Sequence, residues 1–482
     1  MPDRAPAPPA PHLAVLGAGP AGLAAALAAA ARGVRVTLLD AAPQAGGQFH
    51  RRPAEGLGAR RPQALHHAWR AAERLRQGME AYVRAGRIRH LTEHHVWCVE
   101  PGPGTGFTVH ALRGPEQREP VEVCADGLVL ATGGYEQVLP FPGWTLPGVV
   151  TAGGAQAMLK GTLAVAGDTA VVAGTGPLLL PVAAGLVAAG VTVAALVESA
   201  DPKGLLRHAP VWVAHTAKLA EGAGYAAALL RHRVPVLTRH TVVEAHGTDR
   251  LEAVTVAALD AEGRVRPGTA RRVPCVTLAV GHGMLPQTDL AGTLGCRPDG
   301  LAVHVDAEQR TDVPGVWAAG EATGIGGAQL SFAEGHIAGR SAAARLHGRR
   351  PDPAAWARAA RARDRARAFA AALDTVYAPP AHWTEQVTDD TTVCRCEEVT
   401  AGAVREAVTD LGAGDIRTVK LLTRAGMGWC QGRMCAPAVA ALAGCQLVPS
   451  PRPFARPVPL GVLARRADDP DDTAHPTGRE SG

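Results

Sequence analysis

Four of the nine cysteines in this 482-residue chain lie close together in two pairs. The first pair is Cys394-Arg-Cys396, and the second ends the stretch Gly428-Trp-Cys430-Gln-Gly-Arg-Met-Cys435. Two pairs of thiolates, brought together by the helical segment expected over 401–411, are what an iron–sulfur cluster or a structural zinc ion requires. The single residue between Cys394 and Cys396 favours iron, because zinc sites more often use C-x₂₋₄-C pairs.

A glycine-rich turn near the N-terminus has the pattern of a dinucleotide-binding loop. Gly17-Ala-Gly19-Pro20-Ala21-Gly22 separates an apolar stretch from an Ala-rich one, and Asp40 ends the next apolar stretch. The first glycine allows the tight turn, and the second lets the backbone approach a pyrophosphate. The third lets the helix pack on the strand, so that its N-terminal amides face the phosphates. Asp40 is placed to accept a hydrogen bond from a ribose hydroxyl. The alternative is a strand-to-helix turn without a ligand, which this full context disfavours.

A second loop, Gly174-Thr-Gly176-Pro-Leu-Leu179, begins in the same way but departs from the pattern. Leu179 replaces the third glycine, and Pro181 follows within the first helical turns, where proline removes a backbone donor. Glu198 ends the following strand and could accept from a ribose hydroxyl, although an acid there opposes the phosphate of NADP. The loop is therefore compatible with NAD(P), with another adenine nucleotide such as ATP, or with an empty structural domain.

The elements that position these loops form two β-α-β units. A strand is expected over 12–16, a helix over 21–32 and a strand over 34–40; the pattern returns with a strand over 170–173, a helix to about 189 and a strand over 192–198. Helical stretches are expected over 62–85 and 353–372, and strands over 107–112, 121–125 and 127–131. Residues 275–345 are expected to form short strands, a glycine cluster and a closing helix. The chain is thus predicted to be α/β, with two Rossmann-like dinucleotide-binding domains and a small, mostly helical C-terminal domain.

Composition restricts the classes of function. A net charge of +5 over 482 residues, with no Lys/Arg block interleaved with aromatics, argues against nucleic-acid binding. Aromatic residues make up 4% of the chain, so the core must consist largely of Ala, Val and Leu. Glycines and arginines interrupt the apolar stretch 13–39, which is not expected to span a membrane. No export signal is recognised, so a cytoplasmic protein is expected, for which peripheral membrane contact stays open.

The cysteine segment resembles a known iron–sulfur domain. Cys394-x-Cys396-Glu-x-Val, together with Gly-x-x-Cys430-Gln-Gly-Arg-x-Cys435, is similar to the bacterioferritin-associated-ferredoxin type of [2Fe–2S] domain. On this resemblance, Cys394, Cys396, Cys430 and Cys435 are the cluster ligands. Gly426, Gly428 and Gly432 would let backbone amides approach the inorganic sulfides. Cys445 lies outside the motif and is expected to be a packed thiol.

The remaining motifs resemble those of the two-dinucleotide-domain flavoproteins, the pyridine-nucleotide-disulfide-reductase-like superfamily. Ala131-Thr132-Gly133 resembles the segment that lies against the first nucleotide site, and Gly320-Glu321 the segment that contacts the ribityl and pyrophosphate region. Glu321 stands where that superfamily usually has Asp. Gly46-Gly47-Gln48 matches the segment that passes close to the flavin, and Val96 is a further expected cofactor contact. FAD is therefore predicted at the first loop.

Two nucleotide folds followed by this cysteine domain resemble the larger flavoprotein subunits of hydrogen cyanide synthase, opine oxidase and the dye-linked proline or hydroxyproline dehydrogenases. The resemblance runs over residues 10–465 and includes Gly281-His-Gly-Met-Leu-Pro-Gln-Thr-Asp-Leu290 and Pro457-Val-Pro-Leu-Gly461. It implies that an amine or amino acid is oxidised on a separate, smaller FAD subunit. The present chain would relay the electrons to an acceptor such as a quinone or another carrier. The alternatives are a self-sufficient NAD(P)H:acceptor oxidoreductase and a nucleotide-binding scaffold without turnover.

These interpretations divide the chain into five parts. Residues 10–155 and 276–347 form the FAD-binding domain, and 156–275 the second nucleotide-binding domain. A helical connector covers 348–390, the [2Fe–2S] domain 391–450 and a C-terminal tail 451–482.

No catalytic acid or base can be named from the sequence. His208, His282 and His336 are candidates for a flavin face, but each is expected more often to be structural, and Lys160 and Asp289 are no better supported. None of the four cysteines outside the cluster segment has a C-x-x-C or C-x₄-C partner, so disulfide reductase chemistry is disfavoured. Their side chains are expected to be small, buried and apolar; they are Cys98, Cys124, Cys275 and Cys296.

Overall fold

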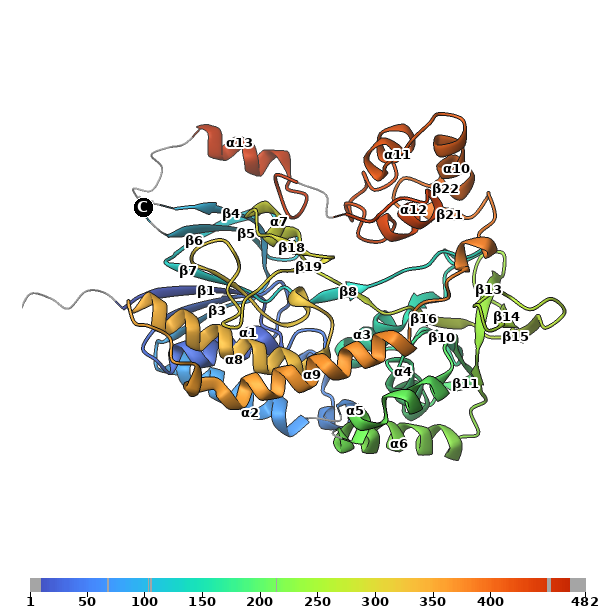
Figure 1. Ribbon diagram of the computed structural model, residues 1–482, viewed down its shortest axis with the longest axis horizontal. Helices are drawn as coiled ribbons and strands as arrows, with labels where there is room; N and C mark the ends of the chain where they lie inside the picture. The colour runs from blue at the N-terminus through green and yellow to red at the C-terminus, as the bar shows by residue number, and fades with distance from the viewer. Residues whose placement is uncertain are drawn as a thin grey trace, which may run out of the picture.

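A computed structural model describes residues 10–66, 69–102, 104, 106–213, 215–448 and 452–468 of the chain. Two parallel sheets lie side by side, and a small helical domain sits above the second of them (Figure 1).

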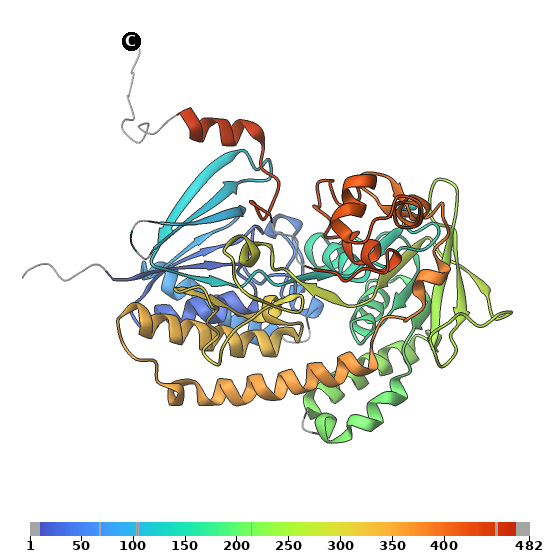
Figure 2. The ribbon, with the colours of Figure 1, turned by 45° about the horizontal axis from the view of Figure 1, so that its top comes forward.

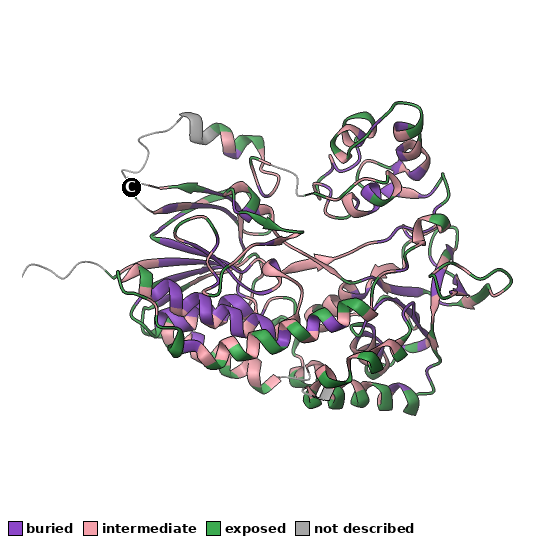
Figure 3. Ribbon diagram, in the orientation of Figure 1, coloured by how far each residue is buried: buried purple, intermediate pink, exposed green. Residues whose placement is uncertain are grey.

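The first sheet is parallel and has the order β20-β7-β1-β2-β3. Its strands are β1 (His12–Leu16), β2 (Arg35–Leu39), β3 (Ile88–Leu91), β7 (Gly127–Leu130) and β20 (Val316–Ala318). Helices α1 (Pro20–Ala30), α2 (Trp69–Arg84) and α8 (Gly327–Leu346) cover one face, and α1 and α8 pack closely on each other. The buried core here is rich in alanine and valine, as the scarcity of aromatic residues predicts (Figure 3).

A three-stranded antiparallel sheet covers the other face of the first sheet. It consists of β4 (His94–Pro101), β5 (Phe107–Arg113) and β6 (Glu119–Ala125). Short elements follow later in the chain: β18 (Pro298–Asp299), β19 (Ala302–Val303) and α7 (Asp289–Thr293), which packs near β4. The sequence predicted β5 and β6 but not β4, whose alternation is masked by two histidines and a proline.

The second sheet has the order β12-β11-β10-β16-β9 and is also parallel. Its strands are β9 (Val149–Thr151), β10 (Thr169–Gly174), β11 (Thr192–Glu198), β12 (Val236–Thr238) and β16 (Thr277–Gly281). Its helices are α3 (Ala152–Thr162), α4 (Leu179–Ala188), α5 (Ala209–Val213) and α6 (Thr216–Arg231), and an antiparallel sheet adds β13 (His240–His246), β14 (Ala253–Ala258) and β15 (Arg271–Pro274). Strands β8 (Gly134–Glu136) and β17 (Met284–Pro286) pair where the chain crosses between the two sheets.

The predicted domain bounds need a correction at both crossings. Strands β9 and β16 fall inside the bounds expected for the FAD-binding domain, yet both pair in the second sheet. The domain boundary at each of these two strands is set by the strand with which it pairs. The second sheet therefore begins before residue 156 and continues beyond residue 275.

Helix α9 (Ala357–Val376) is the predicted connector, and it runs along both nucleotide domains (Figure 2). It packs on α8 at one end and on the 3-10 segment Pro202–His208 at the other. The helix predicted over 62–85 is divided: a 3-10 turn (Pro62–Leu65) precedes α2, and residues 67 and 68 lie outside the described residues.

The C-terminal domain comprises β21 (Thr392–Cys394), β22 (Val399–Thr400), α10 (Ala401–Thr409), α11 (Ile416–Thr423) and α12 (Ala436–Leu442). The Trp144 indole N–H donates to the Thr392 carbonyl at 2.6 Å and ties the domain to the second sheet. Beyond it, the chain returns to the β4–β6 sheet, where Phe454 stacks edge-on to Trp97, and ends in α13 (Leu460–Asp468). Within the described residues, no helix combines the length and apolarity needed to cross a membrane.

Candidate functional site

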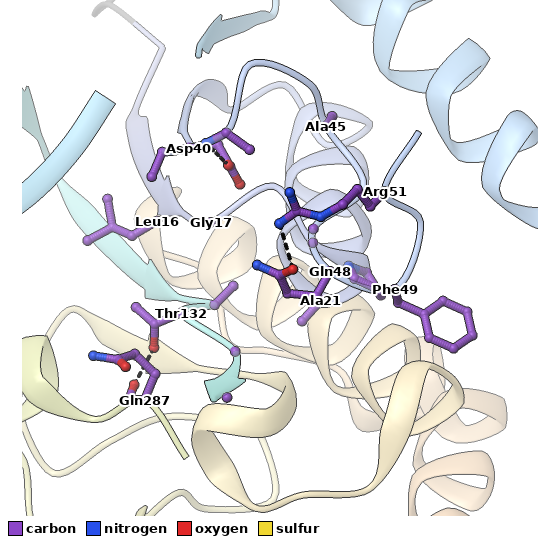
Figure 4. Close-up of a pocket in the computed structure, with 18 of the residues that line it drawn as sticks. Leu16, Gly17, Ala21, Asp40, Ala45, Gln48, Phe49, Arg51, Thr132 and Gln287 are labelled. Atoms are coloured by element: carbon purple, nitrogen blue, oxygen red, sulfur yellow. Dashed lines mark hydrogen bonds between the residues drawn. The ribbon is translucent and has the colours of Figure 1, made fainter. Parts of the chain in front are cut away.

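A cavity of about 770 Å³ opens at the carboxyl ends of the first sheet, beside the N-terminus of α1 (Figure 4). Most of the residues predicted to bind FAD line it: Gly17, Gly19, Pro20, Ala21, Asp40, Gly47, Gln48, Val96, Ala131, Thr132, Gly133 and Glu321. These residues come from six separate stretches of sequence that only the fold brings together. The cavity volume lies in the range of small-molecule and cofactor pockets.

Gly22 lies behind the cavity and explains the close approach of α1 to β1. A Cβ atom at this position would lie 1.8 Å from the Gly17 carbonyl oxygen and 3.3 Å from Val15 Cγ1. With no side chain there, α1 begins at Pro20, directly after Gly19, and no side chain caps its N-terminus. Its first backbone amides are left without intrahelical partners, as anion binding by a pyrophosphate requires.

Asp40 ends β2 and faces the glycine loop. Its Oδ2 accepts from the Ala18 amide at 2.5 Å, and its Oδ1 accepts from the Ala42 amide at 2.6 Å. Burial raises the pKa of this carboxyl, whereas the hydrogen bonds from the two backbone amides lower it. The glycine turn, the uncapped helix and this carboxyl together fit the phosphate and ribose groups of FAD.

Gly320 also lies behind the cavity, and a buried carboxylate that pairs with a partly exposed arginine holds it. Glu334 of α8 is fully buried; its Oε2 accepts from the Gly320 amide at 2.9 Å, and its Oε1 from Arg367 Nη2 of α9 at 2.7 Å. Glu321, which lines the cavity, has its pKa raised by burial. The connector helix therefore supports the segment that the sequence predicted to contact the ribityl chain.

Replacing Arg367 with methionine should destabilise the protein by about 2 kcal/mol, because it leaves the Glu334 carboxylate buried without its cation. Arg367 itself is 41% exposed at its side chain, which keeps the loss below that of a fully buried pair. Urea denaturation measures the free energy of unfolding. The exposed Arg365 of the same helix provides the control variant, Arg365→Met, which should stay within about 0.5 kcal/mol of the parent. Equal stabilities of the two variants would contradict the supporting role of Arg367.

Several cavity residues were not predicted. Phe49, Arg51 and Arg52 follow the Gly-Gly-Gln segment directly, and Arg51 donates to the Gln48 side chain at 2.6 Å (Figure 4). The Gln287 backbone carbonyl accepts a hydrogen bond from Thr132 Oγ1 at 2.5 Å. The sequence signal that could have identified Gln287 is its place in the family-like stretch 281–290. Arg433, Ala455 and Arg456 come from the cysteine domain and the tail, and no spacing rule places them here.

The second glycine loop has a different geometry. Gly174 packs against Gly281, but Leu179 is fully buried where Gly22 stands in the first unit, and α4 begins two positions later than α1 does. Glu198 Oε2 accepts from the Gly176 amide at 3.0 Å, and Oε1 from the Ala200 amide at 2.9 Å. The Leu179 side chain thus moves the start of the helix away from the loop.

The titratable candidates lie outside the cavity lining. Thr375 Oγ1 pairs with His208 at 2.9 Å, and Thr175 Oγ1 pairs with the buried His282 at 3.0 Å. His336 lies on α8, and Lys160 donates to Gln156 at 3.0 Å. Asp289 forms ion pairs with two arginines. All these groups have partners or positions that account for them structurally.

No cysteine lines the cavity in the part of the chain that is described, which agrees with the expectation against disulfide reductase chemistry. Cys98, Cys275 and Cys296 are buried as predicted. Cys124 is exposed, because it alternates outward on the edge strand β6, so its predicted burial was wrong.

The four predicted cluster ligands come together in the C-terminal domain. Cys394 and Cys435 are buried and hydrogen-bond each other, whereas Cys396 is exposed and pairs with Cys430. The Gly426 amide donates to Cys394 Sγ at 3.5 Å. Within the described ranges, no three His, Cys, Asp or Glu side chains gather closely enough for a single metal ion. Two facing thiol pairs fit a [2Fe–2S] cluster, which takes two ligands at each iron.

Gly428 keeps this site open. A Cβ atom there would lie 2.1 Å from Cys396 Cβ and 3.2 Å from its sulfur. Burial raises the pKa of the Cys435 thiol, and the neighbouring Cys394 raises it further. Iron must therefore displace a tightly held proton on binding.

Two known protein families match the parts of the chain that contain these two sites. Residues 11–343 match the family described as pyridine nucleotide-disulphide oxidoreductase, and residues 392–443 match the BFD-like [2Fe-2S] binding domain. Hydrogen cyanide synthase subunit HcnB of Pseudomonas aeruginosa is 36% identical over 87% of this chain and 90% of its own. An opine oxidase subunit of Agrobacterium tumefaciens is 33% identical over 89% of this chain and 84% of its own.

Among solved structures, L-proline dehydrogenase from P. horikoshii has a similar fold, with a TM-score of 0.63 at 18% identity over 95% of this chain and 81% of that one. The residues after 443, including Ala455 and Arg456, lie beyond both family matches. The chain belongs to the pyridine nucleotide-disulphide oxidoreductase family, as an FAD-dependent oxidoreductase subunit that carries a BFD-like [2Fe-2S] binding domain and resembles HcnB and the opine oxidase subunit over most of its length.

Proposed function

We propose that this chain receives electrons from a smaller FAD-dependent subunit that oxidises an amino acid or amine, and relays them through its own FAD and [2Fe–2S] cluster to a quinone or another carrier. The relatives named as subunits of hydrogen cyanide synthase and opine oxidase support a partner of this kind. The substrate class would be of the proline, hydroxyproline, glycine or opine type.

One observation carries the proposal: the cluster loop reaches the flavin cavity. Arg433 lies between Cys430 and Cys435 in sequence, and its side chain lines the cavity. Its Nη1 also donates to the Cys430 carbonyl at 3.3 Å. One residue of the cluster loop therefore forms part of the cavity wall, which makes the two cofactor sites neighbours and favours direct electron transfer between them.

The chain's own residues would hold the two carriers. The first amides of α1 would bind the pyrophosphate, Asp40 would accept from the ribose, and the four cysteines would bind iron. FAD supplies two-electron chemistry and the cluster one-electron chemistry. The chain's part is binding, orientation and the exclusion of water from the cavity wall.

The proposal is tested with the purified chain alone, given proline, hydroxyproline, glycine or octopine and an artificial dye acceptor. We expect no dye reduction by the isolated chain, and substrate-dependent reduction when the chain is purified together with a smaller FAD subunit from its own cells. Oxidation of any of these substrates by the chain alone would contradict the relay.

A second candidate function is NAD(P)H oxidation, and the position of Glu198 at the end of its strand favours it. This carboxyl ends β11 in the position that Asp40 takes in the first unit. Gly174 and Gly176 have positive φ angles, as in a dinucleotide loop. Under the relay proposal, this second site binds an adenine nucleotide such as NAD(P) or ATP without delivering hydride to the flavin.

Nucleotide affinity at the second loop should rise with pH. Burial raises the pKa of Glu198 to about 7. Hydrogen bonds from the backbone amides of Ala200, Gly176 and Ser199 lower this pKa, but burial has the larger effect. A ribose hydroxyl donates to the charged form, so a ligand that needs this carboxylate binds about tenfold more strongly at pH 8 than at pH 6. ADP-ribose, which carries the pyrophosphate and both riboses but no redox group, is the probe in calorimetry. The Glu198→Gln variant should show no such rise, and pH-independent binding by the parent would contradict the ribose role.

A further inference from the structure

The wall of the flavin cavity is completed by two segments that belong to neither nucleotide domain. Arg433 comes from the cluster loop, and Ala455 and Arg456 come from the tail after it. Leu290 and Val96 of the FAD-binding part line the cavity beside them. The cluster domain and the tail therefore contribute to the cavity wall in their docked positions.

The docking centres on Asp289, at the first turn of α7. Its Oδ2 lies 2.8 Å from Arg433 Nη2, and its Oδ1 lies 3.2 Å from Arg452 Nη1. All three side chains are about one-fifth exposed. Arg433 Nη2 also donates to the Ala455 carbonyl at 2.6 Å, and Arg452 donates to the Gln431 carbonyl of the cluster loop. One carboxylate thus joins the first domain, the cluster loop and the tail.

The charges at this end of the cavity do not balance. Two guanidinium groups, Arg433 and Arg452, share the carboxylate of Asp289, and a third, Arg456, lines the cavity near Arg433. Arg456 is bound by an imidazole instead of an acid: its Nη1 lies 2.8 Å from His95 Nδ1. Among the described residues, Arg456 forms no ion pair with a carboxylate, and a half-buried arginine of this kind that lines a cavity suits an anionic ligand.

The tail is held in place by packing that does not depend on these charges. Phe454 and Trp97 form an edge-to-face pair with ring centroids 4.9 Å apart. Val458, Val462 and Leu463 complete this apolar cluster on the β4–β6 sheet. Loss of one arginine should therefore leave the tail in place.

We infer that Arg433 and Arg456 are FAD-binding residues supplied by the cluster domain and the tail, and that Asp289 positions Arg433 and the tail residue Arg452, so that flavin retention depends on docking of the iron–sulfur domain. This deepens the proposed function, since it rests on FAD in this cavity next to the cluster. Binding works in both directions: what strengthens docking strengthens FAD binding, and bound FAD stabilises the docked cluster loop.

The test is FAD affinity of the deflavinated, cluster-loaded chain, measured from quenching of FAD fluorescence. Arg456→Met and Arg433→Met should each raise the dissociation constant about 10- to 100-fold, the range for losing a hydrogen bond to a charged group. Asp289→Asn, which leaves both arginines present but removes the carboxylate that holds Arg433, should raise it several-fold. Arg424→Met is the matched control: that arginine of the cluster domain pairs with Glu397 at the surface and should leave the constant within twofold.

Two further measurements separate binding from folding. Iron content and thermal unfolding show whether a variant keeps its cluster and its fold, and Asp289→Asn is informative even if Arg433→Met loses iron, because it lies outside the cluster domain. Hydrogen exchange of residues 428–435 should slow when FAD is added to the parent, and the slowing should be lost in Arg456→Met.

The inference is overturned if folded, iron-loaded Arg456→Met and Asp289→Asn bind FAD as the parent does. That result would leave the relay standing, because the relay is tested by electron donors and not by FAD affinity. Conversely, reduction of the flavin by NADH would contradict the relay without changing these dissociation constants.

Discussion

Replacing Gly22 with alanine should abolish stable FAD binding. The added Cβ atom would lie 1.8 Å from the Gly17 carbonyl oxygen, which is backbone and has no freedom to turn aside. Helix α1 must then move off β1 and take with it the amides that face the cavity. We expect a loss of at least about 100-fold in FAD affinity, from an overpacking penalty of about 3 kcal/mol. Flavin absorbance of the purified chain measures the outcome.

Gly222→Ala is the control for this variant. Gly222 lies in the exposed helix α6, where an added Cβ meets nothing within 4 Å, and the change should keep FAD and leave stability equal or slightly higher. If Gly22→Ala keeps full flavin content, the close contact of α1 with the loop is not what holds FAD.

Replacing Cys435 with serine should remove the cluster. Cys435 is buried at 1% exposure, pairs with Cys394 and has no other thiol able to replace it at that place. A hydroxyl is a poor substitute for the thiolate that iron requires. The variant should lose the broad iron–sulfur absorbance, its iron and the paramagnetic signal of the reduced cluster, while it retains FAD absorbance.

Cys445→Ser provides the matched comparison within the same domain. The Cys445 thiol contacts the Ala443 and Gly414 carbonyls and lies away from the two thiol pairs. Its replacement should keep the full iron content. Loss of iron in Cys445→Ser with retention in Cys435→Ser would reverse the assignment of ligands.

Local pattern was sufficient for the two β-α-β units and for the cysteine motif. Strand β11 was predicted to the residue, and β1 likewise, because apolar runs bounded by a glycine loop and an acid leave little choice. The cavity is lined by most of the residues predicted from the glycine loop and the distal motifs, and Gly22 and Gly320 lie behind it. Each of these signals depends on neighbours in sequence or on a family motif.

Contacts between distant segments could not be predicted. Arg433 lies 144 positions from Asp289, and Arg456 lies 361 positions from His95. No periodicity links such pairs, since they follow from how the cluster domain and tail dock. The assignment of β9 and β16 to the second sheet has the same origin, because a strand of three to five residues carries no mark of its partner.

The degenerate second loop was recognised correctly as different, and the structure gives the reason. Leu179 stands where Gly22 stands in the first unit and is buried, and α4 starts two positions later than α1 when each is counted from the first glycine of its loop. The sequence shows the substitution but not the displacement of the helix.

The most direct test of the relay is the visible spectrum of the anaerobic, purified chain before and after NADH is added. The relay predicts flavin bands over a broad iron–sulfur background that NADH leaves unchanged, and that bleach when a reduced FAD-dependent partner subunit is supplied. Prompt bleaching by NADH alone would contradict the relay and make the chain a self-sufficient NADH:acceptor oxidoreductase.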